Sequence, residues 1–220
     1  MSVIDPVDPN LAAMLWSCAV SRSWAEQDEG PYHREGQAAR RDVVEDRDGI
    51  ALQLGIRLAR EDGSPVTDAR VEVWQCDALG RYSGFPPPDD STRVTAATAP
   101  KAEYLPGETF LRGAQPTDAN GMVEFRTIHP GWYPGRTVHI HVIVAVDDRV
   151  RTSQLYFPEP VNAKVLARSP YADRPGRDTT NATDTIFPTG GDAAVVDVQP
   201  VGDTYRAAVC LLLPNVVPNG

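Results

Sequence analysis

Short apolar runs separated by turn residues dominate the hydropathy pattern of the chain. The 20 prolines and 17 glycines fall mostly between these runs, a texture typical of an all-β sandwich with long loops. We expect strands over residues 50–59, 69–76, 122–128, 137–146, 152–157, 193–199 and 204–213. In the run 69–76, Val71 and Val73 alternate with Glu72 and Trp74, so the two faces of this strand should meet different environments.

Two long segments break the pattern. Residues 1–48 contain at most one short helix, over 10–20, and otherwise predict an irregular N-terminal arm; residues 49–220 form the predicted β-sandwich domain. Residues 85–108 show no apolar period and predict a long excursion between strands. Long loops in compact domains often carry the functional site.

Composition and charge narrow the class of partner. With 220 residues, 41% of them hydrophobic, the chain can bury one sizeable core. Its net charge of −9, without long runs of one sign, gives no support to a nucleic acid or a membrane as partner, so we expect a small-molecule substrate. No apolar run approaches the ~20 residues of a membrane helix, and the N-terminus lacks a signal-peptide pattern, which predicts a cytoplasmic protein.

The three cysteines are Cys18, Cys76 and Cys210, and at least one of them must be unpaired. A reducing compartment is the simplest setting for such a set. Under oxidising conditions a disulfide between Cys18 and Cys76 is the alternative.

The strand predicted over 137–146 carries a His-x-His pair. His139 and His141 should point to the same face of that strand, separated by about 6.6 Å of rise, so both imidazoles can converge on a metal ion above it. The alternative is a pair of buried histidines bound to backbone carbonyls, because two ligands alone do not make a metal site.

Two tyrosines offer the remaining ligands, since no Asp, Glu or Cys is suitably spaced. Tyr133 precedes the histidine pair, and Tyr82 follows the strand 69–76. A phenol titrates near 10, so a phenolate at pH 7 costs about 4 kcal/mol. A hard, highly charged cation offsets this cost, which favours ferric iron over zinc or magnesium. Each tyrosine taken singly also fits a packing role.

Three segments resemble the intradiol ring-cleaving dioxygenases, the family of catechol, hydroxyquinol and protocatechuate enzymes. They are VEVWQCDALGRYSG (71–84), FLRGAQPTDANGMVEFRTIHPGWYPGRTVHIHV (110–142) and TSQLYFPE (152–159). The chain is most similar to the compact bacterial branch without the helical dimerisation domain, and the resemblance runs from about residue 28 to the C-terminus.

The resemblance implies one ferric ion per chain, with a water or hydroxide as fifth ligand and four protein ligands: Tyr82, Tyr133, His139 and His141. It implies that Tyr133 is the axial tyrosine that leaves when substrate binds, and that His139 lies opposite it. Arg136 matches an arginine placed against the substrate, and Gln154 matches a glutamine of the same pocket.

The implied reaction is cleavage of an aromatic ring between its two hydroxyl-bearing carbons by dioxygen, giving a muconate-type diacid. The substrates would be a small aromatic diol and dioxygen, and no nicotinamide or flavin is required. Aromatic compound catabolism is one setting for this reaction, and a biosynthetic pathway is left open as the other. A catechol that binds as a dianion must lose two protons; the hydroxide implied as fifth ligand can accept one of them, and the departing Tyr133 phenolate the other. The preferred catechol is left open because the excursion 85–108 departs from the family pattern. Any homo-oligomer would use surfaces other than a helical zipper.

Purely structural roles are also compatible with the sequence for several of these residues. Arg136 also fits a surface arginine at a strand end, Gln154 a solvent-facing position, and Trp132 either a pocket wall or core packing. His33 and His129 fit no ligand spacing, so we expect them to be structural.

Two other classes of protein compete with the dioxygenase interpretation. A non-catalytic, transthyretin-like or carboxypeptidase-regulatory-like β-sandwich would share the turns at 61–69 and 117–122, but it needs no tyrosine and histidine cluster. A metal hydrolase would use the His-x-His pair with water, but the sequence lacks a suitably spaced acidic base.

Overall fold

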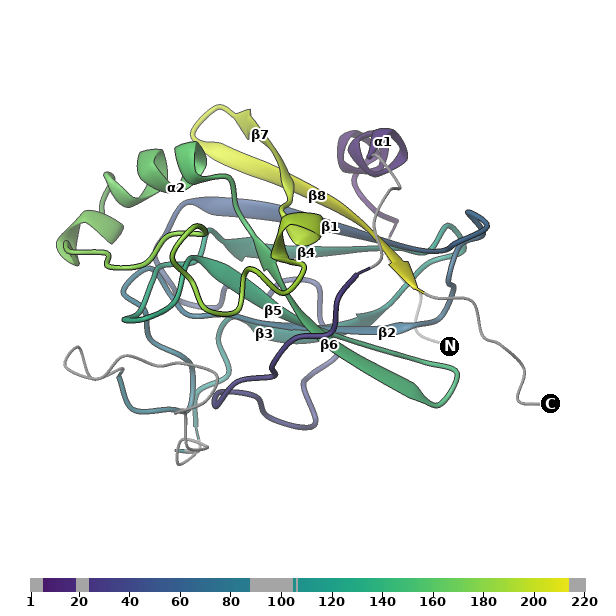
Figure 1. Cartoon of the computed structure of the whole chain (residues 1–220), viewed down its shortest axis with the longest axis horizontal. Helices are drawn as coiled ribbons and strands as arrows, with labels where there is room; N and C mark the ends of the chain where they lie inside the picture. Colours follow the sequence, from purple (N-terminus) through teal and green to yellow (C-terminus); the bar gives the residue numbers. More distant parts are fainter. Residues whose placement is uncertain (1–5, 19–23, 88–104, 106, 214–220) are drawn as a thin grey trace.

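The chain forms two four-stranded sheets packed face to face (Figure 1). The computed structural model describes residues 6–18, 24–87, 105 and 107–213. One sheet has the order β4-β1-β8-β7 and comprises β4 (Met122–Ile128), β1 (Ala51–Arg60), β8 (Thr204–Leu213) and β7 (Asp197–Val201). The other has the order β3-β2-β5-β6 and comprises β3 (Arg112–Pro116), β2 (Arg70–Trp74), β5 (His139–Val146) and β6 (Arg149–Tyr156). The predicted all-β sandwich is therefore confirmed.

The main core lies between the sheets. Alternate residues of each strand point inward, so Val71 and Val73 of β2 and Ile140 and Val142 of β5 are buried with the apolar face of β1. The residues between them point to the outer face of the β3-β2-β5-β6 sheet. On that face Trp74 belongs to a separate aromatic cluster, which confirms the two-faced strand expected from the sequence.

Helix α1 (Pro9–Ser17) covers the outer face of the other sheet (Figure 1). The Asp8 carboxylate caps it by accepting from the backbone N–H groups of Asn10 (3.0 Å) and Leu11 (3.1 Å). The apolar face of the helix packs on β1 at Gly55. A Cβ at that position would lie 2.9 Å from Leu11 Cγ, so a glycine lets the helix approach the strand closely. The helix starts one residue before the predicted range and stops three residues short of its end. No helix in the described part of the chain is long and apolar enough to cross a membrane.

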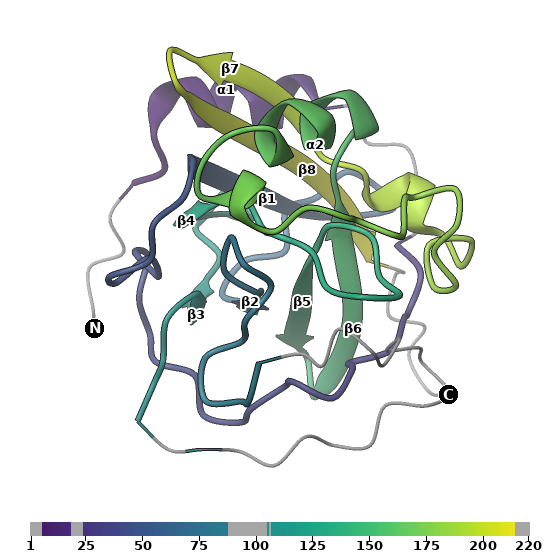
Figure 2. The same ribbon diagram turned by 90° about the vertical axis from the view of Figure 1, so that its left-hand side faces the viewer.

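The N-terminal arm crosses the outer face of the β3-β2-β5-β6 sheet from one edge to the other (Figure 2). At the β6 edge the Gln27 N–H donates to the Thr152 carbonyl (2.9 Å), and at the β3 edge the Arg40 N–H donates to the Ala114 carbonyl (3.1 Å). Between these anchors Tyr32 is buried. The arm is irregular, as expected, and it forms the cover over one end of this sheet.

Several boundaries differ from the sequence expectations. Strand β3 was not predicted, because the segment Arg112–Pro116 has a charged, a glycine and a proline residue among five. The strand expected over 193–199 is a 3₁₀ helix (Gly191–Ala194) followed by β7. Helix α2 (Glu159–Leu166) and a 3₁₀ helix (Tyr171–Asp173) were also missed. Most of the excursion expected over 85–108 lies outside the described residues.

The three cysteines are free thiols. Cys18 ends α1, and its Sγ lies 3.5 Å from Asp197 Oδ2 and accepts a backbone hydrogen bond from Cys210 of β8. Cys76 is buried after β2 in the opposite sheet. The Cys18–Cys76 disulfide left open by the sequence is therefore wrong for this fold, because the two thiols lie on different layers.

Candidate metal centre

Strand register gathers the first side chains of the site. Both β2 and β6 run antiparallel to β5, so their C-terminal ends flank its N-terminal end. His141 is paired across the sheet with Trp74 on one side and Gln154 on the other, and His139 is paired with Tyr156. Cross-strand partners place their side chains on the same face of the sheet.

Two loops at this end supply the tyrosines. Tyr82 follows a tight turn in which the Asp77 carboxylate accepts from the N–H groups of Leu79 and Arg81, both at 2.9 Å. Tyr133 lies in the loop before β5. The two loops touch at Gly131, where a Cβ would lie 2.5 Å from the carbonyl oxygens of Asp77 and Ala78. A glycine at this position lets the loops approach closely enough to share a site.

Four donor atoms of the predicted ligand set converge. His139 Nε2 lies 3.1 Å from His141 Nε2, 3.3 Å from Tyr133 Oη and 3.5 Å from Tyr82 Oη. All four side chains are at most 2% exposed. The fold thus brings together two imidazole nitrogens and two phenol oxygens from three separate segments of the chain.

Burial sets the protonation of these groups when no cation is present. It raises the pKa of Tyr82 and of Tyr133, so both phenols keep their protons. It lowers the pKa of His139 to about 3, with the Arg136 charge adding to the effect, and lowers that of His141 well below its ordinary range. Neutral imidazoles are the form that binds metals.

The second nitrogen of His139 fixes its orientation. Its Nδ1 donates to the Thr137 carbonyl at 2.6 Å, which leaves the Nε2 lone pair directed at the other three donors. Among the described residues no group of three or more His, Cys, Asp or Glu side chains could hold a metal. The phenols must therefore complete any metal site here, and a pair of buried phenolates requires a strongly charged cation. This donor set fits a ferric ion.

Arg136 and Gln154 lie beside the donors. Arg136 is 3% exposed; its Nε donates to Asp184 Oδ2 at 2.9 Å, and its Nη2 donates to Gln154 Oε1. Gln154 also accepts from the Tyr156 hydroxyl (3.2 Å) and donates to the Asp28 carbonyl (3.1 Å). The surface alternative for Arg136 and the solvent-facing alternative for Gln154 are both wrong.

The sequence did not identify three further residues around the donors. Trp74 stacks on His141 with ring centres 4.7 Å apart and planes 5° apart. Tyr32 of the arm stacks on Tyr82 at 4.3 Å and meets Tyr133 edge-on at 5.9 Å. Asp184 holds Arg136. The alternation along β2 placed Trp74 on the face opposite Val71 and Val73, whereas nothing in the sequence marked Tyr32 or Asp184.

The residues expected to be structural lie outside the donor cluster. His33 packs against Trp74, with ring centres 4.7 Å apart, and bonds to Glu29 (2.6 Å) and Glu72 (2.8 Å). His129 is buried against Phe157. Trp132 belongs to the main core, and its Nε1 donates to the Arg174 carbonyl (3.2 Å), which favours the packing alternative.

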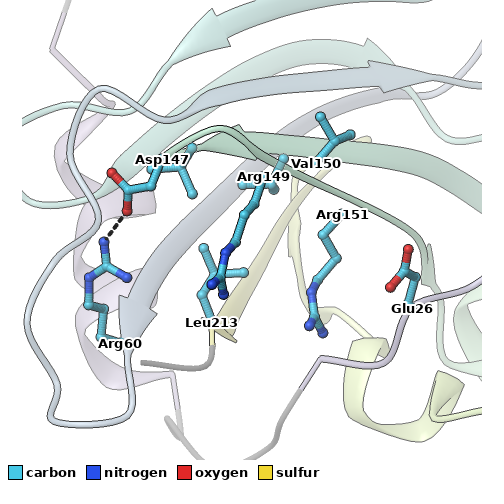
Figure 3. Close-up of a pocket in the computed structure, with 9 residues that line it drawn as sticks. Glu26, Arg60, Asp147, Arg149, Val150, Arg151 and Leu213 are labelled. Atoms are coloured by element: carbon cyan, nitrogen blue, oxygen red, sulfur yellow. Dashed lines mark hydrogen bonds and ion pairs between the residues drawn. The ribbon is translucent and has the colours of Figure 1, made fainter. Parts of the chain in front are cut away.

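A cavity of about 310 Å³ opens at the other end of β5, about 23 Å along the strand from His139 (Figure 3). Valine side chains and Leu213 line it, together with Arg60, Arg149 and Arg151. Arg60 is bound to Asp147 (2.7 Å), and Arg151 donates to the Trp24 carbonyl (2.6 Å). The cavity contains none of the predicted site residues.

Known proteins share both the sequence pattern and the fold. Residues 28–166 match a family model described as "Dioxygenase". An intradiol ring-cleavage dioxygenase from Tetranychus urticae has a similar structure, with a TM-score of 0.77 and 33% identity over 88% of this chain and 95% of that one. The dioxygenase domain of a carbohydrate-binding fusion protein from Streptomyces has a TM-score of 0.65 and 27% identity, over 89% of this chain and all of that one.

Two curated relatives match over shorter regions. The protocatechuate 3,4-dioxygenase beta chain of Burkholderia cepacia is 37% identical over 46% of this chain and 42% of its own length. Catechol 1,2-dioxygenase 1 of Acinetobacter lwoffii is 28% identical over 54% of this chain and 41% of its own length. The chain thus spans about half the length of the curated relatives it matches. Family model, relatives and fold agree, and the chain belongs to the intradiol ring-cleaving dioxygenase family.

Proposed function

We propose that the protein cleaves a catechol-type ring between its two hydroxyl-bearing carbons with dioxygen, using one ferric ion held by Tyr82, Tyr133, His139 and His141. The observation that carries the proposal is the buried convergence of two phenol oxygens and a second imidazole nitrogen within 3.5 Å of His139 Nε2. A β-sandwich used only for binding has no need of such a cluster, and a hydrolase would need an acidic base beside it.

When bound, ferric iron supplies the electron-poor centre that activates a catechol ring toward dioxygen. The chain's own residues prepare the site for this chemistry. Trp74 and the Thr137 carbonyl hold the two imidazoles in place, and Tyr32 covers the ring of Tyr82 and keeps water away. A dry site strengthens every charge interaction within it.

The two tyrosines have different roles in this proposal. Tyr133 accepts at its Oη one of the two protons that a catechol loses on binding, whereas Tyr82 stays an anionic ligand throughout. Tyr133 is suited to take up that proton, because burial raises the pKa of its phenol more than the nearby Arg136 charge lowers it.

Arg136 stabilises the negative charge that develops on the substrate, and Gln154 holds the guanidinium from one side. Both are buried, so their interactions with a bound diol are not weakened by water.

Iron content, colour and oxygen uptake test the proposal together. Protein purified after iron-replete growth should hold about one iron per chain and show the red-brown colour of phenolate-to-iron charge transfer. It should consume oxygen with at least one of catechol, protocatechuate and hydroxyquinol without NADH. A colourless, zinc-loaded protein, or a yellow semialdehyde product from cleavage outside the diol, would contradict the proposal.

A further inference from the structure

The segment between α2 and β7 is bound to the short turn that leads into β5. The Gly135 N–H donates to the Asp178 carboxylate (3.1 Å), and the Thr137 hydroxyl donates to Asn181 Oδ1 (2.7 Å). The Thr137 N–H donates to Asp184 Oδ2 (2.8 Å). The family match ends at residue 166, so these hydrogen bonds to the turn come from a part of the chain outside the matched region.

Asp184 accepts hydrogen bonds both from this turn and from its own segment. Its Oδ2 accepts from Arg136 Nε (2.9 Å) as well as from the Thr137 N–H, and its Oδ1 accepts from the N–H groups of Ile186 (2.7 Å) and Phe187 (2.9 Å). The side chain is fully buried. Four donors saturate the carboxylate, and one of them is the guanidinium that lies beside the metal ligands.

The Asp184 contact restricts Arg136 to one orientation. A free arginine side chain carries about 2 kcal/mol of rotamer entropy. Here Asp184 holds Nε while Gln154 holds Nη2, so the plane of the guanidinium is fixed from two sides. Nη1 is the one guanidinium nitrogen to which the described residues offer no hydrogen-bond acceptor. It is the atom left available to a substrate oxygen.

We infer that Asp184 is a positioning residue: it aims Arg136 Nη1 at the substrate by holding Nε and the N–H of Thr137 at once. The inference rests on the proposed function for its effect on catalysis. Asp184 acts through Arg136, so replacing Asp184 should lower kcat/KM only while Arg136 is present.

A double-mutant cycle separates this role from simple support of the loop. The variants are Asp184→Asn, Arg136→Ala and the two combined, with Asp178→Asn as the matched control. Asp178 binds the same turn through the Gly135 N–H, whereas Nε and Nη2 of Arg136 donate to Asp184 and Gln154. We expect Asp184→Asn to lower kcat/KM by about 10- to 100-fold, the usual cost of losing an orienting partner, with iron content and colour unchanged. Adding it to Arg136→Ala should change kcat/KM by less than about threefold.

A second measurement does not depend on activity. In metal-free protein, NMR of the Arg136 Nε–H should show slow exchange in the wild type and in Asp178→Asn, and exchange faster by about tenfold or more in Asp184→Asn. If the wild type cleaves no catechol, the proposed function fails, and this comparison still tests the contact between Asp184 and Arg136.

Three results would overturn the inference. They are equal losses of kcat/KM in the presence and absence of Arg136, an equal loss in Asp178→Asn, and unchanged Nε–H exchange in Asp184→Asn. If Asp184→Asn does not fold, Asp184→Glu keeps the charge but displaces the acceptor, and it should fold with reduced kcat. Failure of both variants to fold would mean that the carboxylate serves the fold rather than Arg136, and would also contradict the inference.

Discussion

The chain buries histidines in two regions, one around His129 and one around His139 and His141. Among the described residues, only the second region has enough donor atoms for a metal site. His129 and His141 are both 0% exposed, and burial lowers the pKa of each. His129 and His139 even use Nδ1 alike, toward the backbone carbonyls of Pro130 (2.9 Å) and Thr137 (2.6 Å). Burial and a satisfied Nδ1 therefore do not distinguish a ligand from a packed histidine.

The regions differ in what surrounds Nε2. The Nε2 atoms of His139 and His141 lie 3.1 Å apart with two phenol oxygens beside them. His129 instead packs its ring on Phe157 at 4.5 Å, and the described residues offer its Nε2 no hydrogen-bond partner. The convergence of several donors on one point makes the difference, and it arises because two loops bring Tyr82 and Tyr133 to the end of β5 that carries both histidines.

The largest expected effect comes from removing a histidine in each region. His139→Ala and His141→Ala should each lower iron affinity by more than the 10- to 100-fold typical of second-layer changes, because a direct ligand is lost. His129→Ala should keep its iron and lose only stability. Metal analysis of the three purified variants measures this. Full iron in both His139→Ala and His141→Ala would place the metal elsewhere.

The two tyrosines sharpen the comparison inside the site. Tyr82→Phe should give a weakly coloured, poorly loaded and inactive protein, because it removes a permanent anionic ligand. Tyr133→Phe should keep a coloured site but bind catechol slowly, because it lacks the oxygen that accepts the substrate proton. Stopped-flow binding of catechol, with iron measured in the same samples, distinguishes the two. Wild-type binding and turnover in Tyr133→Phe would contradict its assigned role.

The smallest effect concerns the loss of stability that His129 causes in acid. Its pKa is about 4 in the folded protein, against about 6.5 in the unfolded chain, because burial disfavours its charged form. The unfolded state therefore takes up the proton first, and stability is lost as the pH falls from about 6.5 toward 4. Between pH 7 and pH 5 this amounts to about 2 kcal/mol.

Urea unfolding of the wild type and of His129→Gln at the two pH values isolates this contribution, because His139 and His141 are the same in both proteins. The wild type should lose about 2 kcal/mol more than the variant between pH 7 and pH 5. Equal losses would mean that His129 is not held in its neutral form by burial.

The histidine pair could be predicted from the sequence because it depends on local periodicity, whereas the full ligand set and the places of Arg136 and Gln154 came from the family resemblance. The His-x-His spacing requires both rings to share a face, and the alternation in β2 placed Trp74 on the face opposite Val71 and Val73. The apolar runs of β4 and β8 predicted their boundaries correctly. Strand β3 was not predicted because its residues lack that periodicity, and its place in the sheet comes from pairing with β2.

The residues that escaped prediction reach the site through long-range contacts. Tyr32 arrives on an arm fixed at both edges of a sheet, and Asp184 arrives from a segment 47 positions beyond the turn it binds. Neither contact has a sequence spacing that could reveal it, because each depends on how the irregular segments are anchored on the finished sandwich.

Anomalous diffraction at the iron edge from crystals of iron-loaded protein shows directly whether the four side chains of the proposed site hold the metal. We expect one strong peak per chain, in contact with His139 Nε2, His141 Nε2 and Tyr82 Oη, with Tyr133 Oη as the fourth protein ligand in the absence of substrate. A peak bound to other residues, or no peak at these atoms in crystals whose iron content is one per chain, would contradict it.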